Sequence, residues 1–258
     1  MQASHGGFFA SQDADSEGAE GKFFVWTADQ VNDALRGDEL AADVARRYFG
    51  VTDEGNFEES GTTVLAENRP LSAVASALDK PLAEVEDALT RAVVKLLAVR
   101  EKREKPFRDE KILASWNGLV IGALADASIA LGEPALLSAA EKAFEYVERL
   151  LVEDGAVARL AMDDVVKGPG FLDDHAFVCA AALDLYEATG TEHYLTCARA
   201  IADRTIARFW DDADVGFFYT PSDAERLIVR SKDPFDQAIP SGGSIACLAL
   251  SKLASISD

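Results

Sequence analysis

The sequence predicts an all-α fold in which helical hairpins repeat and close into a ring, an (α/α) toroid with short β-hairpins between the helical pairs. The main observation is a repeat. The segment from Ser115 to Gly132 superposes on the segment from Leu172 to Gly190, which gives a unit of helix, glycine turn, helix and strand pair. The first helix of each unit is apolar nearly all round and the second is amphipathic, as expected of inner and outer layers.

Local signals mark most of the elements. Thr27-Ala-Asp-Gln30 is a capping box that opens a helix, and Gly132 and Gly190 are turn signals between paired helices. Helices are expected at about 27–36, 39–48, 71–79, 82–104, 112–131, 134–153, 172–189, 192–210 and from 243 onward. Strand pairs are expected for 6–11 with 22–26, within 156–168, and for 216–220 with 227–230. These elements amount to four or five hairpins, so we expect one incomplete toroid over residues 1–258, a fragment that lacks its last hairpins.

Composition limits the partners and the compartment. The 258 residues carry a formal net charge of −20, which disfavours nucleic acid and anionic membranes as partners. The acids are scattered over helix faces, as in halophilic proteins of a high-salt cytoplasm. We identify no secretory signal and no apolar run of the ~18 residues that a membrane span needs. Cys179, Cys197 and Cys247 have no metal-site spacing and indicate free thiols in a reducing, cytoplasmic compartment.

The candidate site is where a Gly168-Pro-Gly turn precedes Asp173, Asp174 and His175, at the start of an apolar helix. Free backbone N–H groups and the helix dipole favour a polar ligand there. In the repeat, Trp116-Asn117 and Gly243-Ser244 start matching inner helices, so these polar groups are expected at one mouth. The alternative stays open that Asp173 and Ser241 are helix caps and Trp116 is core. His175 is the one histidine placed for catalysis, whereas His5 and His193 are expected on the surface.

An acidic loop, Gln12 to Gly21, follows the first expected strand. It begins like a calcium loop, but Phe24 occupies the position where an EF-hand requires Glu, so we predict no EF-hand. A solvated loop, a looser cation site, or a rim loop supplying a catalytic carboxylate remain alternatives. Asp13 or Asp15 could form with Asp173 or Asp174 the acid/base couple of glycoside hydrolysis. Further candidate ligand-binding side chains at the rim are Lys111, Arg230, Lys232, Asp236, Ser241 and Ser244. No metal site or cofactor is predicted.

Six segments together resemble one family: GGFFASQDADSEGAEGKFFVWT, YFGVTDEGNFE, RDEKILASWNGLVIGAL, GPGFLDDHAFV, LYEATG and RSKDPFDQAIPSGGS. They are similar to the helical part of the YyaL-like, spermatogenesis-associated thioredoxin-domain-containing family. The resemblance implies an (α/α)6 toroid of the six-hairpin glycosidase type, related to N-acylglucosamine 2-epimerases, preceded by a thioredoxin-like domain that is absent here. Gln237 and Gly243 depart from the residues usual in the family.

Two functions are therefore expected. In the first, the chain acts on or binds a small carbohydrate as a glycosidase- or epimerase-like enzyme. Asp173 or Asp174 is then the general acid or base, with His175 as partner, Trp116 stacking on the sugar and Asn117 binding a hydroxyl. In the second, the chain is a non-catalytic binding or scaffold module that works with the thioredoxin-like domain.

Overall fold

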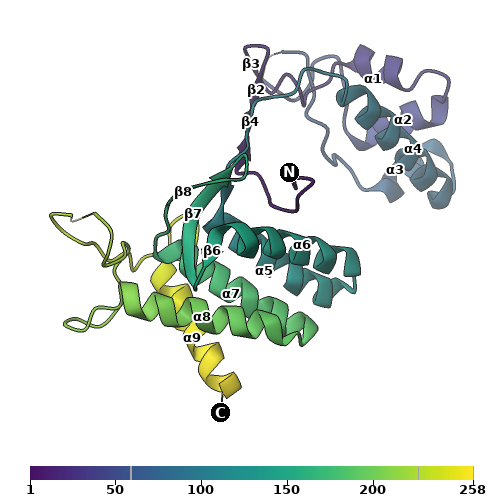
Figure 1. Cartoon of the computed structure of the whole chain (residues 1–258). Helices are drawn as coiled ribbons and strands as arrows, with labels where there is room; N and C mark the ends of the chain where they lie inside the picture. Colours follow the sequence, from purple (N-terminus) through teal and green to yellow (C-terminus); the bar gives the residue numbers. More distant parts are fainter. Residues whose placement is uncertain (59, 226, 258) are drawn as a thin grey trace. The chain divides into compact units, whose positions relative to one another are not determined.

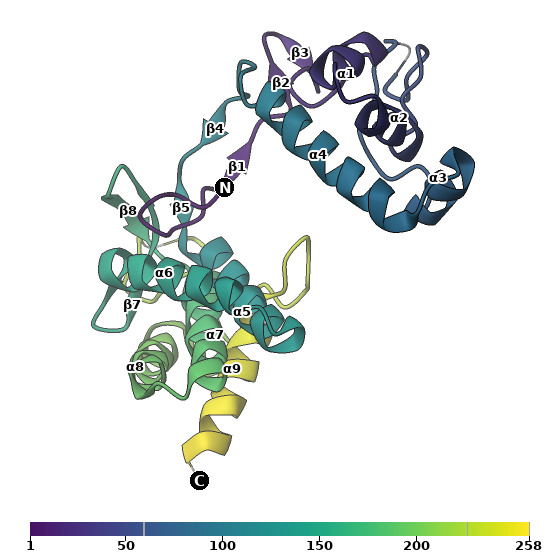
Figure 2. The same ribbon diagram turned by 90° about the vertical axis from the view of Figure 1, so that its right-hand side faces the viewer.

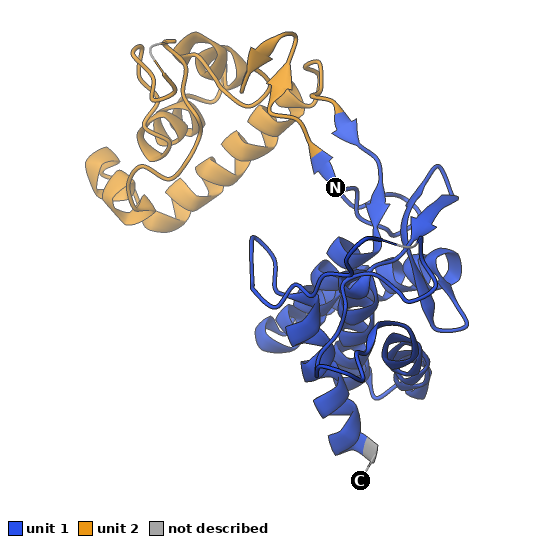
Figure 3. Ribbon diagram, turned by 90° about the vertical axis from the view of Figure 1, so that its left-hand side faces the viewer, with its two compact units in different colours: residues 1–11, 108–258 blue, residues 12–107 orange. Residues whose placement is uncertain are grey.

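The computed structural model describes residues 1–58, 60–225 and 227–257, and in these it contains nine helices and eight short strands. The expected helices are all present, with ends within four residues of the predicted ones. The chain divides into two compact units (Figure 3): unit 1 comprises residues 1–11 and 108–258, and unit 2 comprises residues 12–107. The single partial toroid over 1–258 therefore stays a prediction, whereas the mostly helical character is confirmed.

Unit 2 is a small helical cluster. Its helices are α1 (Ala28–Ala34), α2 (Glu39–Tyr48), α3 (Leu71–Leu78) and α4 (Leu82–Arg100), and β2 (Asp15–Ser16) pairs with β3 (Ala19–Glu20) in the acidic loop. The predicted capping box is present: the Thr27 hydroxyl accepts the Gln30 N–H at 3.2 Å, and the Gln30 carbonyl oxygen accepts the Thr27 N–H at 3.1 Å. α4 packs on α2 and α3, and the core includes Trp26, Val31 and Leu35.

Unit 1 holds the repeat. Its helices are α5 (Ala114–Leu131), α6 (Pro134–Leu151), α7 (Leu172–Thr189), α8 (Glu192–Phe209) and α9 (Gly242–Ser257). Strand β7 (Ala156–Met162) pairs antiparallel with β5 (Ile112–Leu113), β6 (Val152–Glu153) and β8 (Val165–Pro169), while β1 (Ser11–Gln12) pairs with β4 (Arg108–Asp109). Gly132 and Gly190 end α5 and α7 in the left-handed conformation, at φ 68° and 67°, which explains why the two inner helices stop at equivalent points.

Helix α7 is the inner helix of unit 1. It contacts α5, α8 and α9 (Figures 1 and 2), and twelve of its residues are buried, including Phe177, Leu183 and Leu185. The backbones of α5 and α7 come so close that a Cβ on Gly118 would lie 2.6 Å from the carbonyl carbon of Phe177. A glycine is required at this crossing, because any side chain would push the two helices apart.

Helix α5 differs from the prediction of a nearly solvent-free inner helix. Most of its first half is buried, but Ile129 and Leu131 are 62% and 69% exposed. Within unit 1, α5 packs on the helices α6 and α7 and lacks the third helical neighbour that α7 has. By length and composition alone α5 is also apolar enough to cross a membrane, contrary to the expectation that no run reaches this length. The core helix of a folded domain passes the same test, and the buried half of α5 packs as such a helix does.

Two expected strand pairs are wrong. Residues 22–24 form a turn, and Phe8 bridges Gln2 in place of the 22–26 segment. In the described part of 216–230, Phe217 forms an isolated bridge with Trp210, whose backbone is extended directly after α8, at φ −66° and ψ 141°. The hairpin within 156–168 is confirmed as β7 and β8.

Leu183 provides a test of the inner position of α7. Leu183→Ala should lower the free energy of unfolding by ~2–5 kcal/mol, because a fully buried leucine leaves a cavity. Leu131→Ala, at an exposed position of α5, is the matched control and should change stability by less than ~0.5 kcal/mol. Urea unfolding of both variants measures the difference, and equal effects would contradict the assignment.

Candidate functional site

Three helices of unit 1 begin at one place. The backbone N–H of Ser115, in the first turn of α5, donates to Asp174 Oδ1 of α7 at 3.1 Å. The start of α9 packs on the start of α7, since a Cβ on Gly242 would lie 3.0 Å from the backbone nitrogen of Asp173. The geometry therefore brings together the three helix starts that the repeat placed at one mouth.

Asp174 is the residue that joins these elements. Its side chain is fully buried, and Oδ2 accepts the backbone N–H of Phe171 at 2.9 Å. Both of its oxygens also accept from Arg159 Nη1, each at 3.0 Å. A buried carboxylate is tolerated when it is paired and fully hydrogen-bonded, and here strand β7, helix α5 and the residue preceding α7 supply those partners.

Arg159 was not predicted from the sequence. It lies on β7, and its Nη1 also donates to Asp173 Oδ2 at 3.1 Å, so one guanidinium bridges two adjacent carboxylates. The bridged oxygens are therefore no more than about 6 Å apart. Asp173 retains 7% exposure, and its Oδ1 makes no hydrogen bond of normal geometry to the described residues. Tyr219 is close enough that its pKa is raised to about 12, by burial first and then by the charge of Asp173.

Burial acts in opposite directions on the pKa values of Asp174 and Arg159. Burial, and then the charge of Asp173, raises the pKa of Asp174 to about 6, although Arg159 and the Phe171 N–H act in the other direction. Burial alone would lower the pKa of Arg159, but the charges and hydrogen bonds of Asp174 and Asp173 outweigh it and raise that pKa. The guanidinium therefore stays charged, while the Asp174 carboxyl titrates near neutrality.

His175 is held by the backbone. Its Nε2 accepts the N–H of Val157 at 3.0 Å, and its Nδ1 lies 2.9 Å from the carbonyl oxygen of Phe171, to which it donates. Burial lowers the pKa of His175 to about 4. A buried neutral imidazole with both nitrogens engaged has no position left for a substrate, so the geometry gives no support to the expected acid/base role of His175.

The two residues of α5 that were expected to bind sugar have different surroundings. Asn117 is buried: its Oδ1 accepts the N–H of Phe8 at 2.8 Å, and its Nδ2 donates to the carbonyls of Phe8 and Leu113 at 3.0 and 2.9 Å. It fastens the N-terminal segment to α5 and has no free amide group for a hydroxyl. Trp116 is 42% exposed, so it is not a core residue.

The residues expected around the start of α9 lie together and line a hollow that contains neither Asp173 nor Asp174. Ser241 caps the helix, since its hydroxyl accepts the Ser244 N–H at 3.2 Å, and Asp236 in turn accepts the Ser241 N–H at 2.8 Å. With Lys232 and Cys247, Ser241 and Ser244 line a separate hollow of about 380 Å³. Lys232 is paired with Asp211 at 2.9 Å, and its charge is compensated locally.

The remaining predicted residues are dispersed. Arg230 Nη2 donates to the Thr220 carbonyl at 2.5 Å. Lys111 pairs with Asp109 at 2.7 Å on an exposed turn. Asp13 and Asp15 are exposed in unit 2, so the acid/base couple between them and Asp173 or Asp174 stays a prediction.

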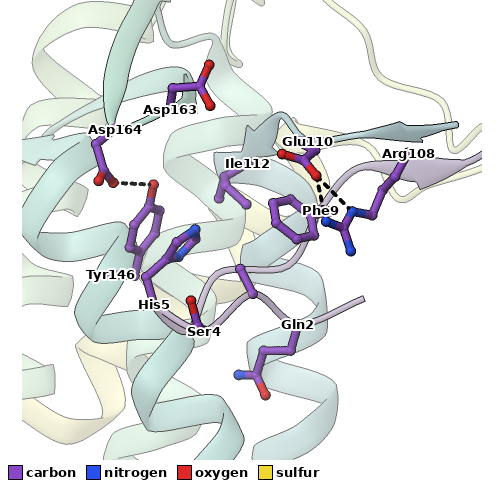
Figure 4. A pocket seen from close by; sticks show the side chains of 11 residues that line it. Gln2, Ser4, His5, Phe9, Arg108, Glu110, Ile112, Tyr146, Asp163 and Asp164 are labelled. Atoms are coloured by element: carbon purple, nitrogen blue, oxygen red, sulfur yellow. Dashed lines mark hydrogen bonds and ion pairs between the residues drawn. The ribbon is translucent and has the colours of Figure 1, made fainter.

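A further hollow of unit 1 lies against the N-terminal segment and α6 (Figure 4). Its volume is about 370 Å³. His5 is exposed, as expected, yet its ring is stacked on Tyr146 at a centroid distance of 4.0 Å. No sequence signal had indicated this hollow, because its lining comes from four separate segments.

Comparison of the sequence with those of known proteins finds homologues in animals. No protein-family model matches it. It is 31% identical to spermatogenesis-associated protein 20 of Homo sapiens over 96% of this chain and 36% of that protein. An uncharacterized protein of Caenorhabditis elegans is 30% identical over 96% of the chain and 37% of its own length. The chain thus spans little more than a third of these relatives.

The solved structures found by the comparison are more distant. An inactive variant of alpha-1,6-mannanase of Salegentibacter sp., in complex with alpha-1,6-mannotriose, is 14% identical at a TM-score of 0.45, covering 89% of this chain and 65% of its own. A D-mannose isomerase is 18% identical at a TM-score of 0.35, with 65% and 50% covered. Such TM-scores do not establish a common fold.

The chain is, then, a mostly helical protein of repeated hairpins with a buried carboxylate cluster where three helices begin. The resemblance predicted from its motifs is confirmed: the human and mouse forms of spermatogenesis-associated protein 20 (YyaL-like) are homologues of this chain, at 31% and 29% identity over 96% of it.

Asp174→Asn should destabilise unit 1 by at least ~2 kcal/mol, because an amide places a donor against N–H donors and leaves Arg159 with one carboxylate. Asp173→Asn is the control: it removes one bond to Arg159 and should have the smaller effect. Thermal and urea unfolding of both variants give the comparison. Similar small changes would show that Asp174 does not hold the helix starts together.

The lowered pKa of His175 predicts a pH dependence of stability. The folded state favours neutral imidazole, so its contribution is fully present above the unfolded pKa of about 6.5 and is lost as the pH falls through about 4, by up to ~3 kcal/mol. His175→Gln should remove this slope, whereas His193→Gln, on the exposed side of α8, should keep it. Urea unfolding between pH 4 and 7 measures the slope, and an unchanged slope in His175→Gln would refute the assignment.

Proposed function

We propose that the chain is the carbohydrate-handling helical part of a longer, thioredoxin-domain-containing cytoplasmic protein, and that its sugar binds at the start of α7. The observation that carries the proposal is the pair Asp173 and Asp174 on one guanidinium, at the junction of three helix starts. Adjacent carboxyls in unlike surroundings are the arrangement that acid/base chemistry on sugars requires.

The roles follow from exposure. Asp174 is fully buried and its oxygens are engaged, so it positions other groups and does not touch the ligand. Asp173 is 7% exposed, and its buried Oδ1 makes no hydrogen bond of normal geometry to the described residues, so in this proposal it is the acid nearer to the sugar. Arg159 orients both carboxylates, and Trp116 supplies an exposed ring face on which a pyranose can stack.

Glycoside hydrolysis needs a second acid that reaches the ligand. Asp174 is inaccessible, so in this proposal the second acid is a residue other than Asp174. An epimerase-like reaction on the same sugar is the related possibility, since it also depends on proton transfer by positioned side chains.

A specific observation favours the second candidate, a non-catalytic binding module. Asn117 and His175 both hold backbone groups and offer nothing to a substrate. A site in which Asp173 and Trp116 alone contact the sugar would bind without turnover.

Sugar binding is tested with a panel of neutral mono- and oligosaccharides, observed by saturation-transfer NMR. The wild type should bind at least one, and Asp173→Asn should bind about tenfold or more weakly, because it loses a charge-assisted hydrogen bond. Asp203→Asn, at an exposed position of α8, is the control and should bind as the wild type does.

The outcomes separate the two functions. Release of reducing ends or epimer formation that is lost in Asp173→Asn supports the enzyme, and binding without turnover supports the module. Absence of binding to the whole panel, or equal binding by Asp173→Asn, would remove the carbohydrate proposal.

A further inference from the structure

The hollow of Figure 4 is distinct from the Asp173 cluster and has its own chemistry. It lies between the N-terminal segment, β4 and the residues after it, α6 and the β7–β8 turn, all within unit 1. Its volume of about 370 Å³ fits a small organic molecule. None of the residues predicted for the sugar site lines it.

One wall is flat and largely aromatic. The His5 ring stacks on Tyr146, with 20° between the ring planes, and meets Phe9 edge-on at 6.2 Å; Ile112 completes the surface. His5 Nδ1 accepts the N–H of Gly7 at 3.3 Å, and this hydrogen bond helps to fix the orientation of the ring. An aliphatic chain or a planar group of a ligand can pack against such a wall.

The opposite rim is acidic. Asp163 and Asp164 form the β7–β8 turn, and Glu110 faces them across the opening (Figure 4). Tyr146 donates its hydroxyl to Asp164 Oδ1 at 3.0 Å, which leaves Oδ2 free. Asp163 has no hydrogen-bond or ion-pair partner within the described residues. Glu110 Oε1 receives both bonds from Arg108, at 3.2 and 2.5 Å, and its Oε2 stays open.

Among the residues that line the hollow, three carboxylates face one guanidinium, which lies over the Phe9 ring at 4.2 Å. A second guanidinium, that of Arg149, lies outside the lining at 5.4 Å from the Tyr146 ring, so the charges come closer to balance without cancelling. Acceptor oxygens outnumber donors at the rim, which favours a ligand that carries N–H groups and positive charge. Among the described residues no three acids, histidines or cysteines converge as a metal ion needs. The negative charge is spread around an opening with an aromatic wall, as suits a cation larger than a metal ion.

We propose that this cavity binds a small organic cation, an ammonium or guanidinium group on a short aliphatic chain. The cationic group lies between Asp163, Asp164 and the free oxygen of Glu110, and the aliphatic chain lies along His5 and Ile112. The site is independent of sugar binding at α7.

Calorimetric titration of the 258-residue chain tests the proposal with agmatine, with N-acetyl-arginine amide, and with butylurea as the uncharged counterpart. Agmatine should bind, and binding should weaken as salt rises, because exposed charges are screened. Butylurea should bind about tenfold or more weakly, since it lacks the charge. Binding of N-acetyl-arginine amide as tightly as agmatine identifies a protein side chain as a possible source of the cation, whereas preference for agmatine identifies a free amine.

The paired substitution Asp163→Asn with Asp164→Asn should lower agmatine affinity about tenfold or more. Asparagine tolerates the positive φ of both positions, so the turn should persist. Asp154→Asn is the matched control, because Asp154 also has a positive φ in a neighbouring turn but lies outside the cavity. Absence of agmatine binding, equal binding of butylurea, or equal losses in Asp154→Asn and the paired variant would each overturn the proposal.

Discussion

The carboxylate of Asp174 is the interaction on which the rest of unit 1 depends. It joins the first turn of α5, the residue before α7 and, through Arg159, strand β7. The three groups come from separate elements. Without Asp174, the N–H groups of Ser115 and Phe171 would lose their acceptor, and Arg159 would lose one of its two carboxylates. Removing any partner would leave a buried charge or N–H unsatisfied, which costs more than a surface contact of the same kind. The position of the helix starts thus follows from one buried ion cluster.

The same cluster separates structural from ligand-facing roles. Complete engagement makes Asp174 and His175 parts of the scaffold, although their sequence positions look equivalent to that of Asp173. Asp173 keeps 7% exposure, and its buried Oδ1 makes no hydrogen bond of normal geometry to the described residues. Homology to spermatogenesis-associated protein 20 does not identify a reaction, so the chemistry has to be inferred from such differences in hydrogen bonding.

The helices could be predicted from the sequence because their signals are local. The capping box at Thr27 and the glycine ends at Gly132 and Gly190 are decided by residues within one turn. The short strands could not be placed reliably, because a two-residue strand such as β1 is selected by its distant partner and carries no periodicity. The exposed half of α5 was misjudged for a related reason: an apolar sequence shows that a helix can be buried, and the neighbours decide whether it is.

The candidate site could be located but not interpreted from the sequence. The repeat correctly brought the starts of α5, α7 and α9 together. Arg159 was missed because it is one charged residue on a strand with no motif around it, and only the strand's position aims it at Asp173 and Asp174. Asn117 illustrates the converse error: a polar residue at a predicted mouth was expected to bind ligand, whereas it holds the backbone of Phe8.

Carboxyl titration of Asp174 by carbon-detected NMR tests the central claim most directly. Its carboxyl carbon should titrate with a pKa of about 6, because burial disfavours the charged form. The amide proton shifts of Ser115 and Phe171 should move with the same midpoint, since both N–H groups donate to that carboxylate. A midpoint near the ordinary aspartate value of about 4, with no response of these two amides, would contradict the account of Asp174 as the buried residue that joins α5, the start of α7 and β7.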